Sequence, residues 1–156
     1  MITKLFIDTN VMMDLLGERV PNYDSIAKIA TLADKGKVKM VVSAFSYPTV
    51  YCLLKKFESS DKVKEKLRKF KIISEISDLD ETIIEKGLAS NFSDFEDALQ
   101  YHCALKADCD ILITRNAKDF KESALPVMSA GEFLQSRKNI SFEWNESASF
   151  TSVLMY

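Results

Sequence analysis

The chain has 156 residues, 47% of them hydrophobic, and 21 Lys and Arg against 23 Asp and Glu give a formal net charge of −2. This length suffices for one domain with a substantial core and is too short for two. The charge balance excludes a protein that holds nucleic acid by a general basic excess. No apolar run approaches the ~20 residues of a membrane-spanning helix, and the start lacks a signal-peptide pattern, so we expect a cytoplasmic protein.

Short apolar runs alternate with segments of helical spacing along most of the chain. In chain order, the sequence predicts a strand over 4–7, helices over 11–17 and 23–35, a strand over 38–42, helices over 48–57 and 62–70, a strand over 72–73, helices over 80–89 and 94–106, strands over 110–114 and 126–128, and a helix over 130–135. This order favours a three-layer α/β/α fold with a central, mostly parallel sheet of four to five strands. Any ligand site is expected at the carboxyl ends of the strands, near the topological switch point.

The last part of the chain departs from this pattern. Ile140, Phe142 and Trp144 alternate with polar residues, which is typical of an edge strand or an interface element. We therefore predict a domain over 1–136 and a C-terminal extension over 137–156.

Cysteine and histidine chemistry has little support. Cys52, Cys103 and Cys109 lack metal-ligand spacing and lie in apolar sequence, so reduced, buried thiols are expected. The single histidine, His102, lies on the apolar stripe of its helix and is interpreted as a packed core residue. One histidine offers little basis for a Ser/His/Asp or Cys/His mechanism.

Three short acidic motifs follow predicted strands or open predicted helices. They are Asp8-Thr9-Asn10, Asp94-Phe95-Glu96-Asp97, and Thr114-Arg115-Asn116 with Asp119-Phe120. Carboxylates that gather in a partly buried cleft raise one another's proton affinity unless a cation neutralises them. Mg2+ or Mn2+ suits such a cluster, because these ions take oxygen ligands and leave positions for water and phosphate. The motifs therefore predict metal-dependent phosphodiester hydrolysis.

Each acid also has a structural interpretation. Asp8 resembles a helix N-cap, but a carboxylate directly after an apolar strand points to the crevice of the sheet, and we favour the site. Asp119 and Asn116 can stabilise a turn, and we expect one of them to reach the metal.

The acids of the second motif divide between capping and ligation. Ser93 and Glu96 have the spacing of a capping box, so Glu96 is interpreted as a cap. Asp97 lies beside the buried stripe of its helix, where an acid needs an explanation, and we assign it to the site. Asp94 is either a second ligand or a first-turn acid favoured by the helix dipole.

Together these motifs resemble the signatures of PIN domains, over residues 1 to about 136. PIN domains are compact α/β proteins, and many are Mg2+- or Mn2+-dependent ribonucleases, including VapC-type toxins. The resemblance implies that Asp8, Asp97 and Asp119 hold the metal and that Asn10 and Thr114 support the site, and Asn116 stands where some members place their last acid. From its place three residues before Asp97, Asp94 is also assigned to the metal, and Asn116 and Glu96 are assigned as supporting residues. Arg115 and Lys118 are the expected RNA-binding pair.

One position departs from the family pattern. The helix after the second strand usually carries a Glu in active members, and Thr49 occupies that place. Two hypotheses therefore remain: a metal-dependent endoribonuclease, and a non-catalytic PIN-like module that binds RNA or protein. A haloacid dehalogenase type of phosphatase is disfavoured because Asn10 stands where it needs a second Asp. The toxin analogy implies an antitoxin partner and a homodimer.

Overall fold

A computed structural model describes residues 1–138, and the predicted tail element lies outside the described residues. The strands are β1 (Thr3–Ile7), β2 (Val38–Ser43), β3 (Ser74–Ser77), β4 (Ile111–Ile113) and β5 (Val127–Met128). The helices are α1 (Thr9–Leu16), α2 (Tyr23–Asp34), α3 (Ser46–Leu54), α4 (Ser60–Ile72), α5 (Glu81–Ala89), α6 (Phe95–Lys106), the 3-10 helix η1 (Ala117–Phe120) and α7 (Ala130–Lys138). No helix within 1–138 is long and apolar enough to cross a membrane.

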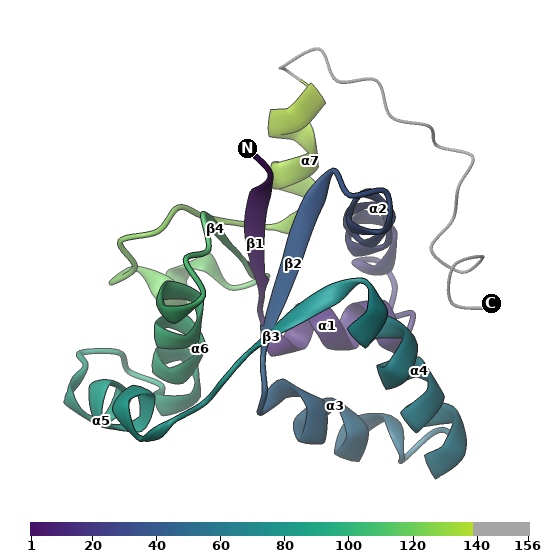
Figure 1. Ribbon diagram of the computed structural model, residues 1–156, viewed down its shortest axis with the longest axis horizontal. Coiled ribbons are helices and arrows are strands. Elements are labelled where there is room, and N and C mark those ends of the chain that lie inside the picture. The colour runs from purple at the N-terminus through teal and green to yellow at the C-terminus, as the bar shows by residue number, and fades with distance from the viewer. Residues whose placement is uncertain (139–156) are drawn as a thin grey trace.

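The five strands form one parallel sheet in the order β3-β2-β1-β4-β5. Helices α1 to α4 cover one face and α5 and α6 the other, which confirms the three-layer α/β/α prediction (Figure 1). The chain builds outward from β1 to β3 and then returns to place β4 on the other side of β1. The topological switch point therefore lies between β1 and β4, and in parallel α/β sheets ligands commonly bind at the carboxyl ends of the strands at this point.

The central strand has side chains buried on both faces. Leu5 and Ile7 belong to the core formed with α1, α2, α4 and α7, whereas Phe6 between them belongs to the core formed with α5 and α6. All three are at most 1% exposed. A strand covered on both faces reads as a continuous apolar run, because successive side chains point to opposite faces.

The predicted strand over 72–73 was wrong. Ile72 is the last residue of α4 and is 82% exposed, Ile73 follows as the C-cap, and β3 begins at Ser74. Within residues 1–138, β3 pairs with β2 alone, so this edge strand needs no long apolar run. Its sequence Ser-Glu-Ile-Ser therefore lacks the apolar pattern that predicts a strand. Other boundaries differ by a few residues; α7 continues to Lys138, beyond the predicted domain boundary, and the division at 136 stays a prediction.

Two predictions of burial were also wrong. Cys52 is exposed, whereas Cys103 and Cys109 are buried as expected. His102 is half-buried and belongs to neither core; its ring lies 5.2 Å from that of Tyr101, beside a surface hollow that Lys86 also lines. Helical spacing alone did not distinguish the margin of a buried stripe from its centre.

Phe120 anchors the short helix η1, because its side chain is 2% exposed and packs in the core beside α6. We expect Phe120→Ala to lower the free energy of unfolding by about 3–4 kcal/mol, through lost burial and a residual cavity. Urea denaturation measures this change. Phe57→Ala is the matched control, since Phe57 is 82% exposed, and a change there as large as at Phe120 would contradict the packing described.

Candidate functional site

Asp8 is the first residue after the central strand, and its side chain is 5% exposed. Asp8 occupies the N-cap position of α1, yet its side chain makes no capping hydrogen bond. Instead, Thr114 after β4 donates from Oγ1 to Asp8 Oδ2 over 2.9 Å, and Thr114 is itself 1% exposed. Burial raises the pKa of Asp8, while Thr114, the backbone N–H of Thr9 and the charge of Arg115 oppose that rise. The switch point thus holds a desolvated carboxylate between β1 and β4.

Asp97 lies in the first turn of α6 and is half-buried. Burial raises its pKa to about 7, and the charges of Asp94, Asp8, Asp119 and Glu96 add to the rise in that order. Acids from three separate segments therefore repel one another across one region. A divalent cation there would relieve this repulsion.

The first turn of α6 is capped differently from the prediction. Asp94 is the N-cap, and its Oδ1 accepts a hydrogen bond from the backbone N–H of Asp97 over 3.0 Å. The Ser93–Glu96 capping box was therefore wrong, and Glu96 is an exposed acid of the first turn. The Asp94 oxygen that caps the helix also fixes the backbone that carries Asp97.

The third motif forms a turn that carries Asp119. The Asn116 N–H donates to Thr114 Oγ1 over 3.2 Å, and the Asn116 carbonyl accepts from the Asp119 N–H over 2.9 Å. The Asn116 side chain makes no hydrogen bond that caps η1, and Asn116 is exposed. Asp119 is exposed, but its negative charge contributes to the raised pKa of both Asp8 and Asp97. Of Asn116 and Asp119, only Asp119 adds negative charge near the other acids, and which of the two reaches a metal stays a prediction.

Asn10 and Lys118 are exposed at the margins of this region. The backbone carbonyl of Asn10 accepts a hydrogen bond from Arg19 Nη2 over 3.1 Å, and its side chain makes no hydrogen bond within residues 1–138. Lys118 lies in η1, one residue before Asp119. Both positions leave the side chains accessible to a ligand.

A buried polar group beside Asp8 was missed from the sequence. Thr9 Oγ1 lies 2.7 Å from Ser46 Oγ, and Gln100 Nε2 contacts the same Thr9 hydroxyl. Gln100 is 2% exposed, and its Oε1 has no hydrogen-bond partner in the described part of the chain. No sequence signal marks this group, because each residue comes from a different helix. It ties the starts of α1 and α3 to α6, one helical turn from Asp97.

Thr49 lies one helical turn after Ser46 on α3, and its Oγ1 donates to the carbonyl of Phe45 over 3.1 Å. The hydroxyl is therefore satisfied within its own helix. No acid replaces the family's usual Glu at this position.

Arg115 was expected, but its partner was not. Its Nε lies 2.9 Å from Oδ2 of Asp14, an acid on α1 that is 1% exposed. Arg19 pairs with the other carboxylate oxygen of Asp14 over 2.9 Å. An acid within an apolar helix reads as a solvent-facing residue, and nothing in the sequence indicates that two arginines enclose it.

The acidic side chains are the oxygen donors available to a metal ion. Within residues 1–138, no three His, Cys, Asp or Glu side chains converge closely enough to form a metal site as they stand. The donor chemistry nevertheless fits Mg2+ or Mn2+, which commonly use one or two carboxylates and complete their shell with water and substrate phosphate. The charge of Asp8 contributes to the raised pKa of Asp97, so these two acids are the candidates for such a pair.

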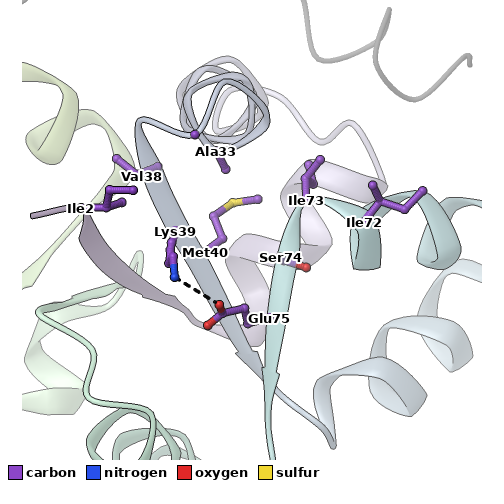
Figure 2. A pocket seen from close by; sticks show the side chains of 10 residues that line it. Ile2, Ala33, Val38, Lys39, Met40, Ile72, Ile73, Ser74 and Glu75 are labelled. Atoms are coloured by element: carbon purple, nitrogen blue, oxygen red, sulfur yellow. Dashed lines mark ion pairs between the residues drawn. The ribbon is translucent and has the colours of Figure 1, made fainter.

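Two surface hollows differ in their relation to these acids. A hollow of about 190 Å³ is lined by Asp14, Arg115 and residues of α2 and the start of α7, beside the switch point. Another, of about 240 Å³, lies at the amino ends of β2 and β3, and Figure 2 shows its apolar lining. Its charged residues Lys39 and Glu75 already pair with each other over 3.6 Å. The second hollow therefore offers no free charge to a substrate.

The model of the PIN domain family matches residues 4–118. The chain belongs to the PIN domain family. The matched range includes Asp8, Asp97 and Thr114 and ends one residue before Asp119. This PIN domain is 28% identical over 137 residues to ribonuclease VapC1 of Aquifex aeolicus strain VF5, with 85% of this chain and 94% of that protein covered.

Solved structures share the fold. VapBC-1 from nontypeable Haemophilus influenzae gives a TM-score of 0.60 at 15% identity, over 83% of this chain and 99% of that chain. A toxin-antitoxin complex from Klebsiella pneumoniae gives 0.58 at 23% identity, over 81% and 97%. These similarities confirm the PIN-like architecture.

The raised pKa of Asp97 predicts a dependence of stability on pH. In the unfolded chain Asp97 titrates near 3.8, and in the folded chain near 7, so the folded chain binds more protons between these values. The contribution of Asp97 to stability is therefore fully present below about pH 4 and is lost as the pH rises toward 7. Without divalent metal, we expect Asp97→Asn to be more stable than the wild type by about 1 kcal/mol at pH 8, a value reduced for solvent screening, and the gain should disappear near pH 4.

Urea denaturation at several pH values in EDTA measures this difference. Glu96→Gln is the matched control, because Glu96 lies in the same turn but is exposed. A gain of the same size for Glu96→Gln, or equal stability of Asp97→Asn and wild type at pH 8, would show that Asp97 lacks the crowded acidic surroundings.

Proposed function

We propose that this PIN domain is a metal-dependent endoribonuclease and acts as the toxin of a toxin-antitoxin pair. The observation that carries the proposal is the electrostatic coupling of Asp8, Asp97 and Asp119 at the switch point of the sheet. The relationship to ribonuclease VapC1 supports RNA as the substrate class. The similarity in fold to VapBC-1 and to a toxin-antitoxin complex supports an antitoxin partner.

Three acids have distinct parts in the proposed reaction. Asp8 is held by Thr114 and oriented at the end of β1, so it is the fixed ligand of the set. Asp97 and Asp119 complete the negative charge from α6 and η1. A bound Mg2+ or Mn2+ would supply Lewis-acid chemistry for the attack of water on an RNA phosphodiester. Arg115 and Lys118 offer positive charge to the phosphate backbone at the rim of the site.

Cleavage of RNA tests this function directly. We expect cleavage that requires Mg2+ or Mn2+ and stops with EDTA, and we expect Asp8→Asn and Asp97→Asn to lower kcat/KM by at least about 100-fold, since each removes charge from the metal site. Asp24→Asn, an exposed acid of α2, is the control that should retain activity. Full activity of Asp8→Asn, or cleavage indifferent to EDTA, would refute the proposal.

The second candidate function is a non-catalytic module that binds RNA or protein. Thr49 favours this alternative, because it removes the carboxylate that active members usually carry on α3. In the same assay, binding of RNA without any metal-dependent cleavage would support it. The homodimer and the cytoplasmic location expected from the sequence both stay predictions.

Thr49 also gives a gain-of-function test. Thr49 follows Ser46 by one turn, and Ser46 contacts the residue after Asp8, so a longer acidic side chain at 49 would extend on the face of α3 that lies nearest the acids. We expect Thr49→Glu to bind Mn2+ about tenfold more tightly, measured by isothermal titration calorimetry, because an added carboxylate raises metal affinity. Thr49→Gln is the isosteric control without charge. Equal affinity of the Glu and Gln variants would show that position 49 does not reach the metal.

A further inference from the structure

Asp14 on α1 is only 1% exposed, yet the proposed chemistry gives it no part. Its side chain is enclosed by two guanidinium groups, with Arg19 Nε donating to Oδ1 over 2.9 Å and Arg115 Nε 2.9 Å from Oδ2. The Arg115 contact lies outside hydrogen-bond geometry, so Oδ2 has an ionic partner but no hydrogen bond within 1–138. A buried carboxylate is costly unless it is paired. Burial raises the pKa of Asp14, and the charges of Arg115 and Arg19 oppose that rise.

The two arginines have different roles. Arg19 comes five residues after Asp14 and also donates to the Asn10 carbonyl, so it closes the local turn after α1. Arg115 comes from the far part of the sequence and directly follows Thr114, whose hydroxyl holds Asp8. A local arginine would suffice to neutralise one carboxylate. The second pairing instead fixes the position of Arg115.

The fixed guanidinium remains available for a ligand. The Arg115 side chain is 38% exposed, and within residues 1–138 it makes no ion pair other than that with Asp14. The contact with Asp14 is made through Nε, and neither Nη group makes a hydrogen bond or an ion pair within residues 1–138, so both are left to bind an anion. Both residues line the 190 Å³ hollow beside the switch point, so solvent and ligand have access to this side.

We propose that Asp14 is a positioning residue that holds Arg115 against the acidic site, where the guanidinium binds a phosphate of the RNA substrate. This inference rests on the proposed ribonuclease function. A guanidinium held on one side loses less conformational entropy when it binds phosphate, and its planar donors match phosphate oxygens in a bidentate geometry. The acids carry the metal, and Arg115 then fixes the neighbouring phosphate.

The test measures the affinity for RNA of variants whose cleavage activity has been removed. All variants carry Asp8→Asn, and the probe is a short single-stranded RNA of mixed sequence, titrated at several salt concentrations. Asp14→Asn removes a negative charge, so simple electrostatics predicts tighter binding of RNA. We expect the opposite: binding roughly tenfold weaker, with the slope of log K against log salt reduced by about 0.7, the value of one single-strand phosphate contact.

Two further variants separate positioning from general structure. Arg115→Gln should weaken binding to the same extent, and combining it with Asp14→Asn should add no further loss. Arg19→Gln is the matched control, since it removes the other partner of Asp14 and should change binding less than about twofold. Unchanged or tighter binding by Asp14→Asn, or a loss that adds to that of Arg115→Gln, would overturn the proposal.

A third variant keeps the test decisive if Asp14→Asn does not fold cooperatively. Arg115→Lys retains the positive charge, but one ammonium cannot pair with Asp14 and also present a planar pair of donors to phosphate. We expect it to bind as weakly as Arg115→Gln, and wild-type affinity would overturn the proposal. Failure of the proposed function is distinguishable, because it shows as absent cleavage by the unmutated chain in Mg2+ and Mn2+.

Discussion

The site depends on one constraint: a carboxylate buried at the end of a strand that is itself covered on every side. β1 lies between β2 and β4 and has a helical layer on each face, so Asp8 leaves the sheet into a region with little water. Burial raises the free energy of its charged form, and the hydroxyl of Thr114 and the charge of Arg115 only partly offset this cost. The surroundings of Asp8 must therefore supply positive charge or hydrogen-bond donors if the carboxylate is to stay charged.

The fold then adds charge of the same sign. The chain order places the end of β4 beside the end of β1, and the turn after β4 brings η1 with Asp119 to the same side. The first turn of α6 contributes Asp97. Its pKa is raised to about 7, first by burial and then by the negative charges of the neighbouring acids. These segments are separated by more than 80 residues from Asp8 in sequence, so only the parallel topology unites them. Mutual repulsion of this kind disfavours folding unless a cation or a proton compensates.

Arginine and hydroxyl groups around the acids set their geometry. Thr9, Ser46 and Gln100 join three helices next to Asp8, and Asp14 on α1 pairs with Arg115, which follows β4. Such polar contacts between distant segments specify positions that apolar packing alone leaves adjustable. Thr49 stands where the family pattern places a Glu, so α3 adds no carboxylate at this position.

The sequence predicted the parts of this structure that depend on local patterns. The run ending in Asp8, the alternation of strands with helices, and the position of Asp97 beside an apolar stripe all led to the parallel sheet and its acidic edge. Local patterns failed where tertiary contacts decide: Asp94 rather than Ser93 caps α6, and β3 is an edge strand without an apolar run. The pairing of Asp14 with Arg115 joins residues about a hundred positions apart, and no periodicity encodes it.

The most direct test of the shared acidic site is the titration of the Asp97 carboxyl carbon by NMR, with and without Mg2+. The account predicts a pKa of about 7 without the ion and a large decrease when Mg2+ is added, because the cation favours the charged carboxylate. A pKa near the ordinary value of 3.8 that Mg2+ leaves unchanged would contradict it.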